Sequence, residues 1–131
     1  MLCSEVMGQN VQVVNGSDKV AQAARKMRDA EIGFLPVCDP DSQELVGTLT
    51  DRDITVRLVA EGKSANTMVK EVMSTNPVFC HEDDDVEEAR DLMESHQLSR
   101  MIVLDNNGRI AGVISLFDLV AEDDAEETFE H

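Results

Sequence analysis

Gly47-Thr48-Leu49-Thr50-Asp51-Arg52-Asp53 recurs 65 positions later as Gly112-Val113-Ile114-Ser115-Leu116-Phe117-Asp118, and this duplication decides the fold. Upstream the correspondence continues at an offset of 66, where Val6-Met7 matches Val72-Met73 and Asp18 matches Asp84. A repeat of this length is too long for a solenoid unit and short for an independent domain. Two copies packed around a pseudo-two-fold axis, with two similar clefts, are the expected solution.

The charge of the chain is strongly negative and unevenly distributed. Its 131 residues carry a formal net charge of −16. Residues 1–65 hold 7 Lys+Arg and 10 Asp+Glu, and residues 66–131 hold 4 and 17, so the balances are −3 and −13. Such a field argues against nucleic acid or an anionic membrane as a partner. A solubility surface with an acidic tail is the expected reading. A basic protein partner and a salt-adapted source are the alternatives.

The N-terminus and the cysteines indicate a cytoplasmic protein. The first residues lack the basic and apolar regions of a signal peptide, and no run of 18 apolar residues predicts a membrane span. The three cysteines, Cys3, Cys38 and Cys80, are an odd number without a C-x-x-C pattern. This usage favours a reducing compartment over a disulfide framework.

Each repeat is predicted to run strand, helix, strand, strand, helix, which makes the fold class α/β (α+β). In the first repeat we expect strands at 11–14, 34–38 and 45–50, a helix capped by Ser17 and ended by Gly33, and a helix at 51–60. In the second repeat we expect strands at 77–80, 101–104 and 110–115, a helix capped by Asp83, and a helix opening at 116–120. A short helix is expected before each repeat, at 4–7 and 69–73.

The duplicated motif can be interpreted in two ways. Thr50 and Ser115, each followed three residues later by an aspartate, have the pattern of a capping box. The motif also stands where a strand ends and a helix begins, and unpaired N–H groups there favour an anion. A hydroxyl at this place can meet a phosphate, and Asp53 or Asp118 can accept both hydroxyls of a ribose. The same residues can do both.

The ordered set of motifs resembles a pair of cystathionine β-synthase (CBS) domains, also called a Bateman module. The resemblance rests on the duplicated element order, on Asp18–Val20, on Gly33-Phe34-Leu35-Pro36-Val37 and on Gly47–Asp53, and it covers residues 1–122. It implies repeats at 1–62 and 69–122, a linker at 63–68 and a disordered acidic tail at 123–131. It also implies that an adenosine-containing ligand, such as AMP, ADP, ATP or S-adenosylmethionine, binds in clefts between the repeats.

The resemblance implies two unequal ligand sites. The favoured one, site A, would combine residues of both repeats: Thr50, Asp53, Thr75, Val78, Cys80, Arg100 and Ile102. Arg100 would hold the phosphate, because a chain this acidic needs a local cation for that task. Site B would combine Ser115, Asp118, Val11, Val13, Phe34 and Pro36. Phe34 stands there where site A has Arg100, so we expect a nucleoside or nothing in site B.

We therefore predict a stand-alone ligand-sensing protein that is not an enzyme and requires no cofactor. The resemblance implies a homodimer, with apolar helix faces near Ile54, Leu58, Leu116 and Leu119 as candidate contacts. A regulated protein partner is a further candidate. No metal site is expected, because Cys80-His81 has no further ligand at a suitable spacing. A ligand-free dimerisation or docking module remains the main alternative, and a nucleotide hydrolase or transferase remains a further one.

Overall fold

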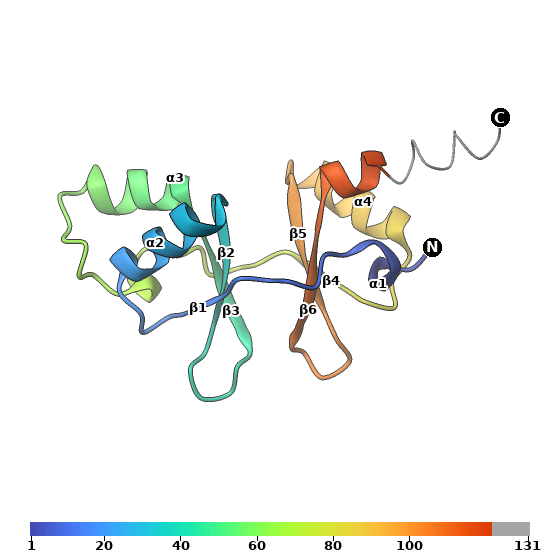
Figure 1. Cartoon of the computed structure of the whole chain (residues 1–131), viewed down its shortest axis with the longest axis horizontal. Coiled ribbons are helices and arrows are strands. Elements are labelled where there is room, and N and C mark those ends of the chain that lie inside the picture. Colours follow the sequence, from blue (N-terminus) through green and yellow to red (C-terminus); the bar gives the residue numbers. More distant parts are fainter. Residues whose placement is uncertain (122–131) are drawn as a thin grey trace. The chain divides into compact units, whose positions relative to one another are not determined.

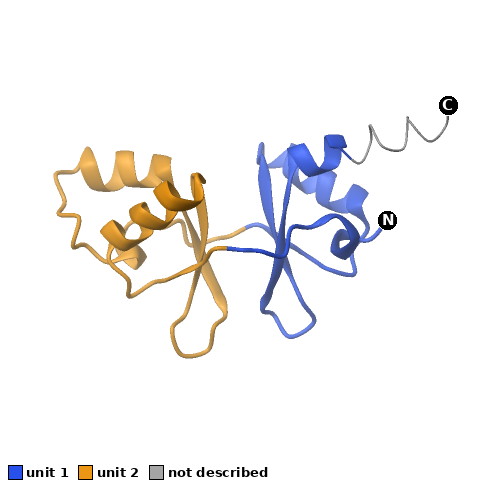
Figure 2. Cartoon of the chain, viewed as in Figure 1, with its two compact units in different colours: residues 1–11, 78–131 blue, residues 12–77 orange. Residues whose placement is uncertain are grey.

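The computed structural model describes residues 1–121 of the chain. They form two compact units (Figures 1 and 2). Unit 2 consists of residues 12–77, and unit 1 combines residues 1–11 with the chain from residue 78 onward. Residues 122–131, which include the whole of the expected tail at 123–131, lie outside the described part.

Unit 2 contains the sheet β1-β2-β3, made of β1 (Val14–Asn15), β2 (Phe34–Cys38) and β3 (Leu45–Thr50). Strand β1 is parallel to β2, and β2 is antiparallel to β3. Helix α2 (Val20–Ala30) crosses over between β1 and β2, and α3 (Asp51–Asp53) continues as a π-helix, η1 (Ile54–Val59). The unit also holds the 3₁₀-helix η2 (Val69–Glu71). In Figure 1, α2 and α3 lie on the same side of this sheet.

Unit 1 repeats this plan with the sheet β4-β5-β6. Its strands are β4 (Phe79–His81), β5 (Arg100–Leu104) and β6 (Ile110–Ser115), and β4–β5 is again the parallel pair. Helix α4 (Val86–Ser95) corresponds to α2, α1 (Cys3–Val6) corresponds to η2, and residues 116–121 are helical in the place of α3. The predicted strands at 34–38, 45–50 and 110–115 have the expected bounds.

Each unit recruits the leading segment of the other sequence repeat. Residues 1–11 open the first sequence repeat but pair with unit 1: Gly8 N–H donates to Val113 O at 2.9 Å, and Val113 N–H donates to Gly8 O at 3.0 Å. In unit 2, Ser74 and Thr48 exchange the same two hydrogen bonds, at 2.9 and 3.0 Å. The compact units therefore regroup the leading segments relative to the sequence repeats at 1–62 and 69–122.

The glycine that opens each duplicated motif makes room for this crossing segment. A Cβ atom placed on Gly112 would lie 2.6 Å from Gly8 O, and one placed on Gly47 would lie 2.5 Å from Ser74 O. Both distances are far inside van der Waals contact. The Gly in Gly-x-apolar-[Thr/Ser]-x-x-Asp thus admits a neighbouring backbone and serves packing.

Each unit has its own apolar core, built from the inward positions of the sheet and the facing stripe of its helices. The core of unit 2 is formed by Val14, Val20, Ala23, Met27, Leu35, Val37, Leu49, Leu58, Val69 and Val72. The core of unit 1 is formed by Cys3, Cys80, Val86, Ala89, Met93, Met101, Val103, Ile114 and Leu119. Val20, Ala23 and Met27, and likewise Val86, Ala89 and Met93, have the spacing of one helix face and are buried, whereas Ala24, which the pattern places on the same face as Val20, is exposed.

The predicted helix caps were wrong in three places. Ser17 does not cap α2, because Val20 N–H and Ala21 N–H donate to backbone carbonyls of residues 67 and 65. Glu31, with φ of 56°, and not Gly33, takes the left-handed conformation that ends α2. Asp85, not Asp83, caps α4 by accepting from Glu87 N–H at 2.8 Å. Strands β1 and β4 are also shifted, to Val14–Asn15 and Phe79–His81.

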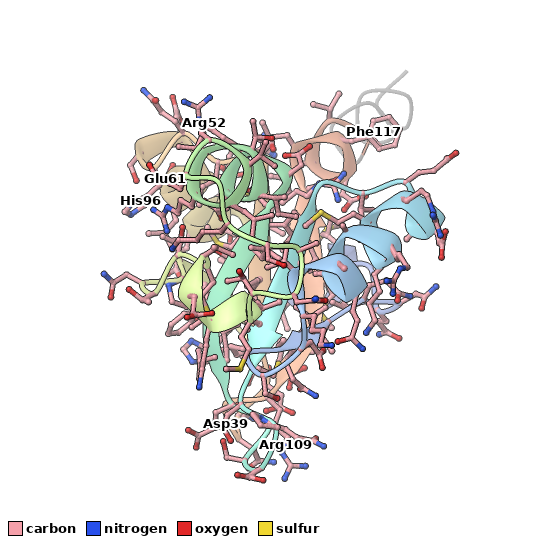
Figure 3. The ribbon with its side chains drawn as sticks, turned by 90° about the vertical axis from the view of Figure 1, so that its left-hand side faces the viewer. Asp39, Arg52, Glu61, His96, Arg109 and Phe117 are labelled. Carbon is pink, nitrogen blue, oxygen red and sulfur yellow. The ribbon has the colours of Figure 1, made fainter. Side chains whose placement is uncertain are left out.

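The helix residues proposed for dimer contact divide into two groups. Leu58 and Leu119 are 5% and 0% exposed and belong to the cores, so they are not surface contacts. Ile54 packs against the core of unit 2, whereas Leu116 is exposed. The apolar side chains that do reach the surface of these helices are Val56, Val59, Leu116, Phe117 and Val120. Phe117, at 79% exposure, projects from its helix in Figure 3.

None of the helices within residues 1–121 is long and apolar enough to cross a membrane.

Candidate functional site

Both copies of the duplicated motif adopt the same hydrogen-bonded geometry. In unit 2, Asp53 N–H donates to Thr50 Oγ1 at 3.1 Å, and Thr50 N–H donates to Asp53 Oδ2 at 3.0 Å. In unit 1, Asp118 N–H donates to Ser115 Oγ at 3.1 Å, and Ser115 N–H donates to Asp118 Oδ2 at 3.0 Å. The predicted capping boxes are therefore confirmed, because each side chain satisfies a backbone donor that the helix leaves unpaired.

The capping geometry leaves one carboxylate oxygen of Asp53 available for another hydrogen bond. Among the contacts of residues 1–121, the cap uses only one carboxylate oxygen of Asp53, and the second oxygen, Oδ1, accepts no hydrogen bond. The side chain of Asp53 is 14% exposed, so its direction is fixed by the surrounding structure. A hydroxyl and a fixed carboxylate at the end of a strand can together accept and donate hydrogen bonds to a polyhydroxylated ligand.

Strand register places a different neighbour beside each motif hydroxyl. Thr50 at the end of β3 is opposite Phe34, the first residue of β2. Ser115 at the end of β6 is opposite Arg100, the first residue of β5. Directly opposite residues have Cβ atoms about 4.5–5.5 Å apart. Arg100, which is exposed, is thus a cross-strand neighbour of the motif of its own repeat.

The remaining predicted site residues are distributed over both units. From the site A set, Thr50, Asp53 and Thr75 lie in unit 2, and Val78, Cys80, Arg100 and Ile102 lie in unit 1. From the site B set, Ser115, Asp118 and Val11 lie in unit 1, and Val13, Phe34 and Pro36 lie in unit 2. The structure brings together the two members of each motif, and the grouping of the complete sites stays a prediction.

Several of these residues differ in what they can offer a ligand. Thr75 and Arg100 are exposed, Val11, Val13, Phe34 and Val78 are half-buried, and Pro36 and Ile102 are buried. The side chain of Cys80 points into the core of unit 1, where its Sγ lies 3.8 Å from Cys3 Sγ. Burial raises the pKa of the Cys80 thiol to about 12, and burial also raises the pKa of Cys3. Cys80 could therefore meet a ligand through its backbone, while its thiol serves packing.

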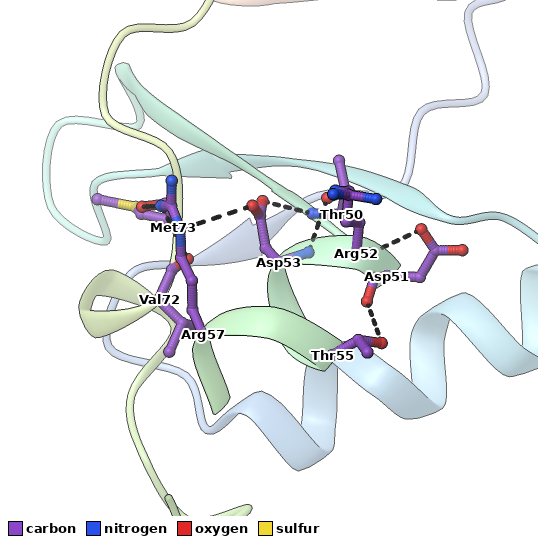
Figure 4. Close-up of polar contacts among 8 residues, drawn as sticks. All are labelled: Thr50, Asp51, Arg52, Asp53, Thr55, Arg57, Val72 and Met73. Atoms are coloured by element: carbon purple, nitrogen blue, oxygen red, sulfur yellow. Dashed lines mark hydrogen bonds and ion pairs between the residues drawn. The ribbon is translucent and has the colours of Figure 1, made fainter. Parts of the chain in front are cut away.

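Arg57 is a residue at this site that the sequence analysis missed. It extends from η1 to within 4.0 Å of Asp53 Oδ1, measured from Nε, and it donates through Nη1 to Met73 O at 3.0 Å (Figure 4). Its signal in the sequence was available, because a basic residue four positions after a motif aspartate faces that aspartate on a helix.

The described residues offer no metal site and one surface hollow apart from the predicted site. No group of three or more His, Cys, Asp or Glu side chains within residues 1–121 could hold a metal ion. A shallow, mostly apolar hollow lies on unit 1 between the end of α4 and the helix at 116–121. It is lined by Arg90, Met93, Glu94, Gln97, Leu98, Ser99 and Leu116, none of which is a predicted site residue.

Comparison with known proteins identifies the family. A model of the CBS domain matches residues 3–60 and again residues 69–124. The protein YlbB of Bacillus subtilis is 37% identical over 123 residues, which span 94% of this chain and 82% of YlbB. Hypoxic response protein 1 of Mycobacterium tuberculosis is 30% identical over 116 residues, which span 88% of this chain and 80% of that protein.

Solved structures share the fold. A crystal structure of hypoxic response protein I with two coordinated zinc ions superposes with a TM-score of 0.83 at 30% identity, over 92% of this chain and 98% of that one. The structure of CBSX2 in complex with AMP gives a TM-score of 0.83 at 23% identity, over 96% of this chain and 98% of that one. With the family model matched twice along the sequence, this chain belongs to the CBS domain family and carries two CBS domains in tandem.

Proposed function

We propose that this protein is a regulatory module that binds an adenosine-containing ligand, such as AMP, ADP, ATP or S-adenosylmethionine. The observation that carries the proposal is the duplicated [Thr/Ser]-x-x-Asp motif, which holds a hydroxyl and a fixed carboxylate in the same geometry in both units. Membership of the CBS domain family supports it. So do structures of the same fold solved with AMP or with S-adenosyl-L-methionine and 5′-methylthioadenosine.

In this proposal, Thr50 and Asp53 are the central contacts of the ligand. The carboxylate of Asp53 accepts hydrogen bonds from the ribose hydroxyls, and the Thr50 hydroxyl donates a hydrogen bond to the phosphate. Arg100 supplies the cation, because a phosphate needs one in a chain of net charge −16. Thr75 completes the polar contacts, and the apolar predicted residues surround the adenine.

The protein would act without catalysis. A ligand can change the behaviour of a protein only by binding one of its states more tightly than another. We propose that occupancy shifts the packing between the repeats or between protomers of a homodimer. The exposed apolar side chains Val56 and Val59 on η1, and Phe117 and Val120 on the helix at 116–121, are candidate contacts for a second copy. We place the protein in the cytoplasm, where its three free cysteines stay reduced.

A second function is favoured by one observation: each capping box is complete without a ligand. If both motifs served only as caps, the exposed apolar helix surface around Phe117 would be the functional feature. The protein would then be a dimerisation or docking module that binds no nucleotide.

Thermal unfolding with AMP, ADP, ATP and S-adenosylmethionine tests the proposal. A ligand at 100 times its dissociation constant adds about 2.7 kcal/mol to the free energy of unfolding. Asp53→Asn and Asp118→Asn form a matched pair, since each keeps the side-chain size and an oxygen for capping. We expect a shift that Asp53→Asn reduces without abolishing it and that Asp118→Asn retains in full. No shift with any of the four ligands would favour the ligand-free module.

The same samples allow a second measurement. The chain contains no Trp or Tyr, so adenine that co-purifies with the protein dominates the absorbance at 260 nm. The variant Arg100→Gln then shows whether the guanidinium of Arg100 binds the phosphate of the ligand or its adenosine part. Loss of AMP binding with retention of adenosine binding is expected if Arg100 holds the phosphate, and equal binding of AMP in the variant and the wild type would contradict that role.

A further inference from the structure

The guanidinium of Arg57 joins two parts of unit 2 that are separated in the sequence (Figure 4). Its Nη1 donates to Met73 O at 3.0 Å and to Val72 O at 3.4 Å. Its Nε lies 4.0 Å from Oδ1 of Asp53. This ion pair joins Arg57 of η1 to Asp53 of the preceding α3. The two carbonyls belong to the segment that follows η2 and leads to Thr75.

The distance to Asp53 is important because it leaves an acceptor available. Asp53 Oδ2 accepts from Thr50 N–H at 3.0 Å. Oδ1 is too far from Arg57 Nε for a hydrogen bond, so the guanidinium attracts this oxygen without occupying it. A ligand hydroxyl could therefore donate to Oδ1 while Arg57 continues to hold the carboxylate in place.

The anchoring of Arg57 explains why an arginine suits this position. Two backbone carbonyls fix one end of the planar guanidinium, and the fork geometry directs Nε toward the carboxylate at the same time. The ammonium of a lysine is a single point charge without this planar fork. It would contact the two carbonyls or Asp53 less completely than the guanidinium does. Arg57 is half exposed, with 50% of its side chain accessible, and Asp53 is much more enclosed.

We propose that Arg57 is a positioning residue of the ligand site: it holds Asp53 in the orientation that accepts ligand hydroxyls and ties it to the Val72–Met73 backbone. This inference rests on the function proposed above. It adds that the carboxylate and the segment ahead of Thr75 respond together when a ligand binds. Ser74, next in that segment, pairs with Thr48 of β3, so the link reaches the sheet.

The second repeat does not carry this arginine in its sequence. At the offset of 65 that aligns Asp53 with Asp118, Arg57 aligns with Glu122, which has the opposite charge and lies outside the described residues. The proposed positioning by Arg57 is therefore specific to the motif of the first repeat. It gives a physical reason for the two motifs to bind a ligand with unequal affinities.

Calorimetric titration of the full chain with AMP and with adenosine tests the proposal. We expect Arg57→Ala to weaken both ligands by about tenfold, a value within the range of coupling between contacting residues. Equal losses are expected because both ligands carry the ribose. A loss confined to AMP would overturn the positioning role, since it would mean that Arg57 contacts the phosphate. Arg57→Lys should restore part of the affinity.

A double-mutant cycle with Asp53→Asn shows whether Arg57 acts through Asp53. We expect Arg57→Ala to cause no further loss once Asp53 is replaced, and fully additive losses would overturn the proposal. Arg28→Ala is the matched control, because Arg28 also pairs with an aspartate on the surface of unit 2, at 2.9 Å from Asp29. This control should bind both ligands like the wild type.

Two measurements distinguish a failure of the proposed function from a failure of the role assigned to Arg57. If the wild-type protein binds neither AMP nor adenosine and also none of ADP, ATP and S-adenosylmethionine, the proposed function fails and this inference fails with it. If the wild type binds and Arg57→Ala binds equally well, only this inference fails. Amide exchange at Ser74 provides a second readout: we expect ligand to slow it in the wild type and not in Arg57→Ala. Slowing in both proteins would contradict the link to the 72–73 segment.

Discussion

Gly112→Ala is the substitution that most directly tests the exchange of leading segments between the repeats. The new methyl carbon would lie 2.6 Å from Gly8 O and 2.7 Å from Met7 Sδ. The sulfur can move, but the carbonyl oxygen is backbone and must retreat by about 0.8 Å to reach ordinary contact at about 3.4 Å. Such a shift would stretch the two hydrogen bonds between Gly8 and Val113 from 2.9 and 3.0 Å beyond bonding distance.

The expected magnitude follows from those two bonds. Each contributes about 1 kcal/mol to stability, so their loss costs about 2 kcal/mol. An alanine also restricts the unfolded chain, which offsets about 0.4–1 kcal/mol. We therefore expect Gly112→Ala to lower the free energy of unfolding by about 1–1.5 kcal/mol. Gly47→Ala should behave similarly, because its Cβ would meet Ser74 O.

Urea unfolding followed by far-ultraviolet circular dichroism measures this change, since the chain lacks Trp and Tyr for fluorescence. Gly8→Ala is the control: its nearest neighbour would be Val113 O at an ordinary 3.8 Å, so it should be neutral or slightly stabilising. Amide exchange at Gly8 and Val113 should accelerate only in Gly112→Ala. Wild-type stability of Gly112→Ala, with both amides still protected, would refute the crossing of residues 7–8 over β6.

Three further predictions concern the core, the thiols and the apolar surface. Leu119→Ala should cost about 2–5 kcal/mol because Leu119 is fully buried, whereas its exposed neighbour Val120→Ala should stay within about 0.5 kcal/mol; equal losses in urea unfolding would contradict the assigned helix face. The raised pKa of Cys80, about 12 against 9.0, means that the native state resists losing this proton, so stability should fall as pH rises from about 9 toward 12; Cys80→Val should flatten this fall in urea titrations, and an unchanged slope would contradict the shift. If the protein dimerises through the exposed apolar helix surface, Phe117→Asp should reduce its mass in light scattering to that of a monomer, and an unchanged dimer mass would exclude Phe117 from the contact.

The strands and the helix stripes could be predicted because their determinants are local. Residues 34–38, 45–50 and 110–115 are short apolar runs bounded by turn-forming residues, and their observed bounds agree with the prediction. The turn after β5 has equally local determinants: Asp105 Oδ1 accepts from Asn107 and Arg109 N–H groups, and Gly108 takes a φ of 78°. Duplication doubled the information, because each pattern could be compared with a second copy.

The helix starts were missed because their partners are remote in sequence. Ser17 is a good N-cap by type, but residues 65 and 67 supply carbonyls to the first N–H groups of α2. In unit 1, Val86 N–H similarly donates to Met1 O at 2.8 Å. These bonds depend on which leading segment packs against which sheet, and a residue pattern along one repeat does not contain that choice. The end of α2 has a local cause instead: Glu31 takes the left-handed conformation, Ile32 N–H donates to Met27 O at 3.0 Å, and Ile32 packs against the core.

The two motifs differ in their surroundings more than in their own geometry. The two hydrogen bonds of the cap have the same lengths in both motifs, 3.0 and 3.1 Å, so the cap alone does not distinguish them. The surrounding cations do: Asp53 has Arg57 on its own helix, while Ser115 has Arg100 directly across the strand pair. Arg57 lies beside the carboxylate that would accept hydrogen bonds from ribose hydroxyls, and the second repeat has no arginine at the matching position of its sequence. The register of Arg100 beside Ser115 competes with its proposed role at Thr50 and Asp53. If Arg100→Gln weakens AMP binding in Asp118→Asn as much as in the wild type, Arg100 serves the first motif; an effect that Asp118→Asn removes would assign it to the second.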